Sequence, residues 1–173
     1  MESPVQEIVD HYSGDKDSIV VGSILIGLGT VFLLFFAGSL RSVLRRAEGE
    51  GGVLSTIALV GATVLAVGIA IDATISVALA ESVDDIEPSA VQALQALWDN
   101  DFLPAIVGAV VFLIASGISI VQHGALPRWL GWVAIALGVA SATPVLFIAL
   151  PLAGIWILVV SVMLAMRART ATA

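Results

Sequence analysis

Residues 53–80 read VLSTIALVGATVLAVGIAIDATISVALA, a run long enough to cross a membrane that contains one charged residue, Asp72. On a helical wheel, small residues at every fourth position form a slowly drifting ladder: Ala58, Ala62, Ala66, Ala70, Thr74 and Ala78. Gly61, Gly68 and Asp72 fall on roughly the opposite side. Because helices in lipid associate where small residues let backbones approach, we expect a central helix with neighbours on both sides.

The composition of the whole chain is typical of a membrane protein. Hydrophobic residues make up 59% of the 173 residues and charged residues 12%, whereas soluble domains are about 45–50% apolar. The absence of cysteine excludes disulfides and thiolate metal sites. The net charge of −7 argues against a nucleic-acid partner. No catalytic or calcium-loop motif occurs, so we expect no enzyme activity, no cofactor and no metal site.

Five hydrophobic runs predict an all-α fold, a polytopic transmembrane helical bundle that forms a single domain. The expected spans are residues 18–40, 53–80, 102–121, 129–147 and 151–167. The last two divide an uncharged stretch that would measure about 57 Å as one helix, nearly twice the ~30 Å hydrocarbon core. Proline and glycine residues in this stretch interrupt a helix, so we predict an apolar hairpin near residues 148–154. Four spans with one kinked helix is the alternative.

Two further segments, residues 4–12 and 88–98, are amphipathic, and we expect them to lie on the outer membrane surface as short helices. The charges predict the orientation. Acidic residues concentrate before residue 18 and in residues 81–101, whereas all six arginines lie in the other loops and at the C-terminus. By the positive-inside rule, the N-terminus is expected outside and the C-terminus in the cytoplasm, and a four-span chain would leave Arg167 and Arg169 outside.

Two short stretches beside the membrane carry a resemblance. Residues 44–49 read LRRAEG and residues 126–132 read LPRWLGW. Both resemble stretches in a group of small, poorly characterised multi-spanning membrane proteins of actinobacteria. The resemblance implies a location in a prokaryotic plasma membrane and no established activity, and it carries over no site residue.

The candidate functional residue is Asp72, which lies eight residues before Ala80. A carboxylate inside a span costs roughly 2.5–3.5 kcal/mol and must be protonated, hydrated or paired, and we expect no cation inside a span to pair with Asp72. One interpretation is a proton or cation site to which Ser76 and Thr74 contribute oxygens. The other is a structural aspartate that is hydrogen-bonded, or that water reaches because the helix ends early.

Two weaker candidates remain. His123 ends the third span, where an exposed imidazole titrates near neutral pH. It is interpreted either as a pH sensor or as an ordinary interfacial residue, and the second reading is favoured. The aromatic stripe Phe32, Phe35 and Phe36 in the first span is interpreted as packing rather than as a ligand cage.

These observations favour a non-enzymatic integral membrane protein that self-associates or joins a membrane complex, with a small cation or proton conduit through Asp72. The alternative is an accessory or lipid-binding scaffold in which Asp72 is structural. The expected partners are membrane lipid and either a second copy or another membrane protein.

Overall fold

The structure, a computed structural model, describes residues 4–170, and within this range it is all-helical, with no strand. Its helices are α1 Pro4–Gly14, α2 Lys16–Glu48, α3 Val53–Ser82, α4 Pro88–Trp98, α5 Phe102–His123, α6 Arg128–Ser141 and α7 Leu146–Thr170. Four helical stretches are long and apolar enough to cross a membrane: α2, α3, α4 together with α5, and α7. This confirms the all-α membrane bundle.

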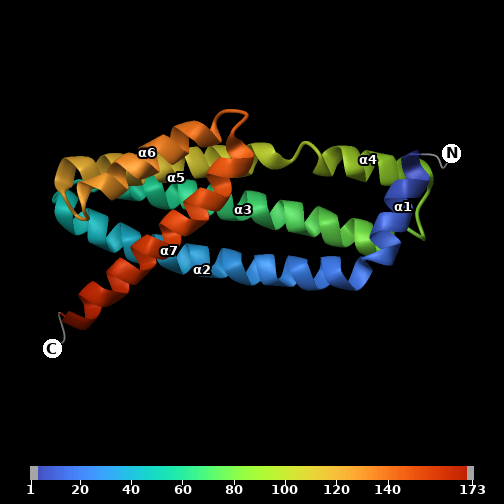
Figure 1. Ribbon diagram of the computed structural model, residues 1–173, viewed down its shortest axis with the longest axis horizontal. Coiled ribbons are helices and arrows are strands. Elements are labelled where there is room, and N and C mark those ends of the chain that lie inside the picture. Colours follow the sequence, from blue (N-terminus) through green and yellow to red (C-terminus); the bar gives the residue numbers. More distant parts are fainter. Residues whose placement is uncertain (1–3, 171–173) are drawn as a thin grey trace.

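The fifth span is not confirmed, because α6 has only 14 residues. At 1.5 Å per residue it measures about 21 Å, short of a ~30 Å hydrocarbon core. It nevertheless forms a hairpin with α7, so the chain returns to the end from which α6 started (Figure 1).

The predicted hairpin near residues 148–154 is wrong, because the turn comes earlier, at residues 142–145. Thr143 Oγ1 accepts a hydrogen bond from the backbone N–H of Val145, and Pro144 lies in the turn, two residues before α7 begins. This arrangement resembles an N-cap followed by proline. Pro151 lies inside α7, where it removes one backbone hydrogen bond without ending the helix.

The long helices lie alongside one another, and α7 crosses α2 obliquely (Figure 1). One end of the bundle, here called the arginine end, carries the α2–α3 and α5–α6 loops and the end of α7. It holds Arg41, Arg45 and Arg46 of α2, Arg128 of α6 and Arg167 of α7. Arg167 donates a hydrogen bond to the backbone carbonyl of Ala125 in the α5–α6 loop. The side chain of Arg169 lies outside the described residues.

The opposite end, here called the acidic end, carries α1 and the α3–α4 loop (Figure 1). The Ser13 hydroxyl of α1 donates to Asp84 of this loop at 2.7 Å. Whereas α1 lies across this end, α4 runs in line with α5 (Figure 1). Val91 of α4 is fully buried in a cluster with Leu79 of α3 and Tyr12 of α1. The surface position expected for α1 and α4 stays a prediction.

Glycine sets the closest helix contacts in the bundle. A Cβ on Gly68 of α3 would lie 2.5 Å from the backbone nitrogen of Ala105 in α5. Gly61 meets the backbone of Phe112 in the same way, and Gly108 meets that of Leu65. The three pairs share one antiparallel register, so α3 and α5 touch backbone to backbone over about two turns.

The alanine ladder of α3 is used over part of its length. Ala58, Ala62 and Ala66 are buried, and the first two share a core cluster with Ala37 and Leu40 of α2. Ala70, in contrast, is exposed. The glycine side of α3 therefore contacts α5, and the core cluster places its alanine side against α2.

Candidate functional site

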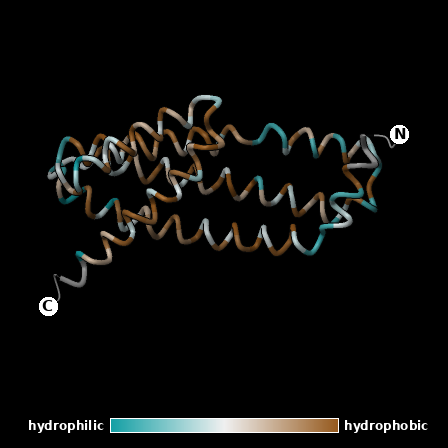
Figure 2. Tube along the Cα trace, in the orientation of Figure 1, coloured by the Kyte–Doolittle hydropathy of each residue, from teal (hydrophilic) through white to brown (hydrophobic). Residues whose placement is uncertain are grey.

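Asp72 is half-buried and lies one turn beyond the Gly68–Ala105 contact. The same register places it opposite Asp101, the residue just before α5, and the two carboxylates are close enough for their charges to interact. Figure 2 shows a hydrophilic segment at the α4–α5 junction, beside otherwise hydrophobic helices. Asp72 thus belongs to a polar layer at a helix junction rather than standing alone in an apolar helix.

Of the other predicted members of this site, Ser76 lies one turn from Asp72 on the same side of α3, whereas Thr74 does not share that side. The Thr74 hydroxyl donates to the carbonyl of Ala70 at 2.7 Å, and the Ser76 hydroxyl donates to the carbonyl of Asp72 at 3.0 Å. Thr74 is exposed and, two residues from Asp72, points to a different side of α3. Both hydroxyl protons are therefore used within the helix.

The polar layer includes residues that the sequence analysis missed. Tyr12 is buried, and its pKa is raised above its ordinary value of 10.0, first by burial and then by the negative charges of Asp99 and Asp72. Gln95 donates to Asp99 at 3.0 Å, an i, i+4 pair at the end of α4. Gln95 Oε1 and Asp101 Oδ2 are buried without a hydrogen-bond partner among the described residues.

Two properties of this layer bear on ion binding and conduction. In residues 4–170, no group of three His, Cys, Asp or Glu side chains is placed to hold a metal ion. Towards the arginine end, the contacts at Gly68, Gly61 and Gly108 close the space between α3 and α5. A path from Asp72 along this interface is therefore blocked by backbone.

A second polar cluster lies at the arginine end. Glu48, the last residue of α2, accepts hydrogen bonds from Ser119 of α5 and from Ser55 of α3, the latter at 3.2 Å. Both serines are fully buried. One carboxylate thus joins three helices, and because both serines lie within apolar runs, nothing in the local sequence indicated this contact.

His123 is exposed in the last turn of α5, and its Nδ1 lies 3.3 Å from the backbone carbonyl of Ser119. This contact is within its own helix. Both interpretations of His123, as a pH sensor and as an interfacial residue, stay predictions.

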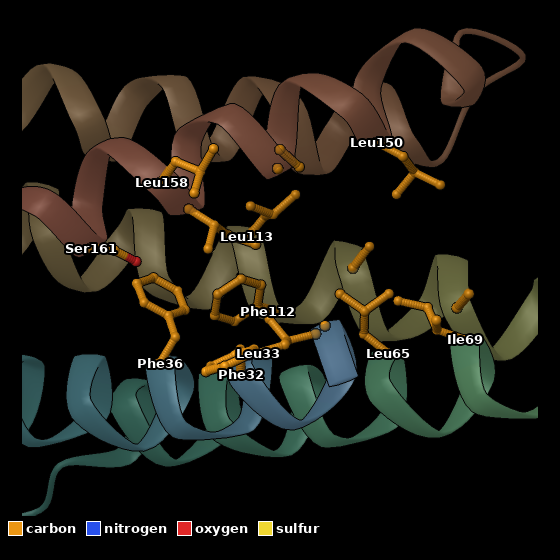
Figure 3. Close-up of a pocket in the computed structure, with 16 residues that line it drawn as sticks. Phe32, Leu33, Phe36, Leu65, Ile69, Phe112, Leu113, Leu150, Leu158 and Ser161 are labelled. Carbon is orange, nitrogen blue, oxygen red and sulfur yellow. The ribbon is translucent and has the colours of Figure 1, made fainter. Parts of the chain in front are cut away.

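One feature that could hold a ligand is an apolar cavity of about 430 Å³ between α2, α3, α5 and α7. Figure 3 shows Leu33 and Phe36 of α2 on one side and Leu150 and Leu158 of α7 on the other. Among its sixteen lining residues, Ser161 is the only one with a polar side chain. The volume falls within the roughly 300–1,000 Å³ of small-molecule sites. We call this space the apolar cavity.

Aromatic contacts fix the floor of the apolar cavity. The Phe112 ring packs edge-on against Phe36, with centroids 6.4 Å apart, and against Trp156, at 6.1 Å. Trp156 donates its indole N–H to the carbonyl of Leu130 at 3.0 Å, which ties α7 to α6. Because the contact with α6 fixes the position of α7, the opposite side of α7 does not need to pack against α2, and the apolar cavity lies between these two helices.

The aromatic stripe of α2 is only partly packed. Phe36 contacts Phe112, but Phe32 is 73% exposed and Phe35 is 74% exposed. Phe32 and Phe36 line the apolar cavity, and all three line a second cavity of about 950 Å³ beside it. The prediction that the stripe serves packing therefore holds for Phe36 and fails for Phe32 and Phe35, because α7 does not close against α2.

In comparisons with protein-family models, curated proteins and solved structures, nothing matched this chain. The resemblance to small actinobacterial membrane proteins therefore stays a prediction.

Proposed function

We propose that this chain is a non-enzymatic integral membrane protein that acts as a lipid-binding scaffold and holds a lipid acyl chain in the apolar cavity. The observation that carries the proposal is the cavity itself, lined by four helices and almost free of polar side chains. In this function, which is the alternative drawn from the sequence, Asp72 is structural.

The physical reason lies in packing. Protein interiors are close-packed, and an empty space of this size would leave its lining atoms without dispersion contacts. In a bilayer, acyl chains are the most abundant apolar molecules that can fill such a space. Lipid tails are as apolar as the residues that line the cavity, so an acyl chain gains little free energy from the change of surroundings when it moves from the bilayer into the cavity. The stabilisation of the complex comes from the dispersion contacts that the acyl chain makes when it fills the cavity.

Two glycines make the proposal testable. Gly29 of α2 and Gly154 of α7 both line the apolar cavity, and a Cβ on either would have no atom within 4 Å. The double variant Gly29→Leu/Gly154→Leu is therefore expected to fill the cavity without displacing backbone. Leucine also has a higher helix propensity than glycine, so folding should be preserved.

The measurement is the amount of lipid that co-purifies with the detergent-extracted protein, read by native mass spectrometry. The double variant should lose bound lipid relative to wild type. Gly22→Leu is the matched control, because Gly22 lies on α2 with equally open space but lines neither cavity. Equal lipid retention by all three proteins would refute the proposal.

Self-association through α2 is a second candidate. Of the most apolar eighteen-residue window of α2, only 6% is buried within the chain. A Cβ added to Gly22 or Gly27 would meet no atom within 4 Å, whereas the space beside the glycines of the α3–α5 contact is occupied by the backbone of the neighbouring helix. A second copy of α2 would supply the missing neighbour. Subunit counting in lipid nanodiscs tests this: a monomer in the wild type, or an oligomer unchanged by Gly22→Leu/Gly27→Leu, would exclude it.

Conduction through Asp72 stays a prediction from the sequence. The backbone contact between α3 and α5 argues against a path along that interface in one chain. Proton flux into liposomes should therefore be the same for wild type and Asp72→Asn, and a loss of flux in the variant would reinstate the conduit.

A further inference from the structure

The α6–α7 hairpin enters and leaves the bundle at the arginine end. Its first helix begins at Arg128, and Arg167 near the end of α7 donates a hydrogen bond back to the carbonyl of Ala125. The 14 residues of α6 measure about 21 Å, and α7 returns obliquely over the same depth (Figure 1). The turn between the two helices, residues 142–145, therefore lies beside the middle of the bundle and not at the acidic end.

Glycine contacts between α5 and α6 give the depth of this turn. A Cβ on Gly131 would lie 2.7 Å from Cγ2 of Val121, and a Cβ on Gly138 would lie 2.7 Å from Cγ1 of Ile114. The two pairs share one antiparallel register, which places the turn opposite residues 107–110 of α5. At 1.5 Å per residue, the turn ends about 9 Å short of Asp101 and of the polar layer to which Asp101 belongs.

Neighbouring helices thus present apolar surfaces of different length. Residues 102–121 of α5 are uncharged and measure about 30 Å, which matches a ~30 Å hydrocarbon core. They end at the hydrophilic junction of α4 and α5 (Figure 2). The hairpin beside them supplies only about 21 Å. A bilayer can adjust to a hydrophobic stretch that is too short by becoming locally thinner.

The hydrogen bonds of the turn indicate what covers it. Residues 142–145 are all exposed. The N–H groups of Ala142, Thr143 and Val145 have acceptors within the hairpin, and Pro144 has no N–H. The carbonyl oxygens of Ala142 and Pro144, in contrast, accept no hydrogen bond from the residues that the structure describes. Hydrocarbon supplies no donor for such oxygens, whereas water and lipid headgroups do.

We infer that the α6–α7 hairpin thins the membrane beside it, so that water and phospholipid headgroups of the acidic-end leaflet descend to the turn at residues 142–145. The interaction surface is this turn with its two free carbonyl oxygens, and its partner is the hydrated headgroup layer. The hydrophilic α4–α5 junction, about 9 Å further along α5, holds that layer near the turn. The inference goes beyond the proposed function and does not depend on an occupied apolar cavity.

Thiol accessibility tests the inference, because the chain contains no cysteine of its own. Val145→Cys in the turn is compared with Val31→Cys in α2, since both valines are 50% exposed. Val31 lies between Gly29 and Phe32, and these two residues line the apolar cavity together with Ala109 of α5, which is opposite the turn. The two variants therefore place a thiol at a similar depth on different sides of the bundle.

A membrane-impermeant maleimide is added to intact cells on the side from which Gln92→Cys of α4 reacts. Val145→Cys should react at least about tenfold faster than Val31→Cys, because the attacking thiolate forms in water and not in hydrocarbon. Equal rates would overturn the inference, since the turn would then lie in hydrocarbon or beneath a second chain. Labelling of Val145→Cys only after the membranes are opened would also overturn it, because water would then come from the arginine end.

A second variant and a lipid measurement complete the test. Ala142→Cys lies in the same turn and should react as fast as Val145→Cys; both substitutions leave Thr143 and Pro144 in place. Elution volume and helical circular dichroism confirm that each variant folds. Because Val145 lines neither cavity, Val145→Cys should retain the wild-type amount of bound lipid. An unreactive turn would therefore refute the thinning alone, whereas full lipid retention by Gly29→Leu/Gly154→Leu would refute the acyl-chain site alone.

Discussion

Single glycines determine how closely the central helices pack. At Gly61, an added methyl group would overlap the backbone of Phe112, which cannot move away as a flexible side chain would. At Gly22 the same methyl group meets no atom. The two positions are indistinguishable by residue type, so only the neighbouring helix makes one of them sensitive.

Gly61→Ala is accordingly expected to destabilise the bundle by about 1–3 kcal/mol, the usual cost of overpacking. Gly22→Ala should be neutral or stabilising by up to about 1 kcal/mol through helix propensity. Unfolding of both variants in mixed micelles, followed by circular dichroism, measures the difference. Equal stabilities for the two variants would contradict the close α3–α5 contact.

Tyr12 reports on the polar layer around Asp72, and it is the only tyrosine in the chain. Its ionisation, followed by ultraviolet absorbance, should occur above the ordinary pKa of 10.0. Asp99→Asn should lower this pKa more than Asp72→Asn, because Asp99 has the larger effect. A pKa at or below 10.0 in the wild type would show that Tyr12 is not buried beside these acids.

The same titration predicts how stability depends on pH. A raised pKa means that folded protein keeps the Tyr12 proton more tightly than unfolded protein does. The stability that this proton contributes is fully present at pH values below the Tyr12 pKa of the unfolded protein. It is lost as the pH rises through the Tyr12 pKa of the folded protein. Stability should therefore fall above pH 10, and Tyr12→Phe should remove this part of the decline.

At the level of elements, the sequence predicts the long helices well. Uninterrupted apolar runs predict α2, α3, α5 and α7. A run of this length with few charges crosses a membrane as a helix, because a helix satisfies its backbone hydrogen bonds within the segment. The boundary between α6 and α7 is mispredicted because Pro144, Pro151 and Gly154 all offer a break. Only tertiary contacts, such as that of Trp156 with Leu130, select the first of them.

The candidate site was much less predictable than the helices. The apolar cavity takes residues from four helices, and none of them belongs to a motif. Its existence depends on the oblique crossing of α7 over α2, which hydropathy does not encode (Figure 1). Asp72 was visible as a lone charge in an apolar run, but its neighbours Asp101 and Tyr12 follow only from helix register.

At the level of the whole molecule, charge separates along the bundle. The described arginines gather at one end, while α1 and the α3–α4 loop bring acids to the other. By the positive-inside rule, we propose that the arginine end faces the cytoplasm of a prokaryotic cell.

The chain contains no cysteine, so single-cysteine variants can test this orientation directly. Gln92 of α4 and Gln122 of α5 are both exposed and carry the same side chain, but Gln122 lies at the arginine end. A membrane-impermeant maleimide added to intact cells should label Gln92→Cys and leave Gln122→Cys unlabelled until the cells are lysed. The reverse pattern would invert the topology.

The central claim is that an acyl chain occupies the space between α2 and α7. The most direct measurement is photo-crosslinking in vesicles with a phosphatidylglycerol that carries a diazirine near the end of one acyl chain, followed by mass-spectrometric mapping of the adducts. The account predicts adducts on the cavity wall, at Phe32, Phe36 and Leu158, and their loss in Gly29→Leu/Gly154→Leu. Adducts confined to outward residues such as Val21 and Leu25, with the cavity wall unlabelled, would contradict it.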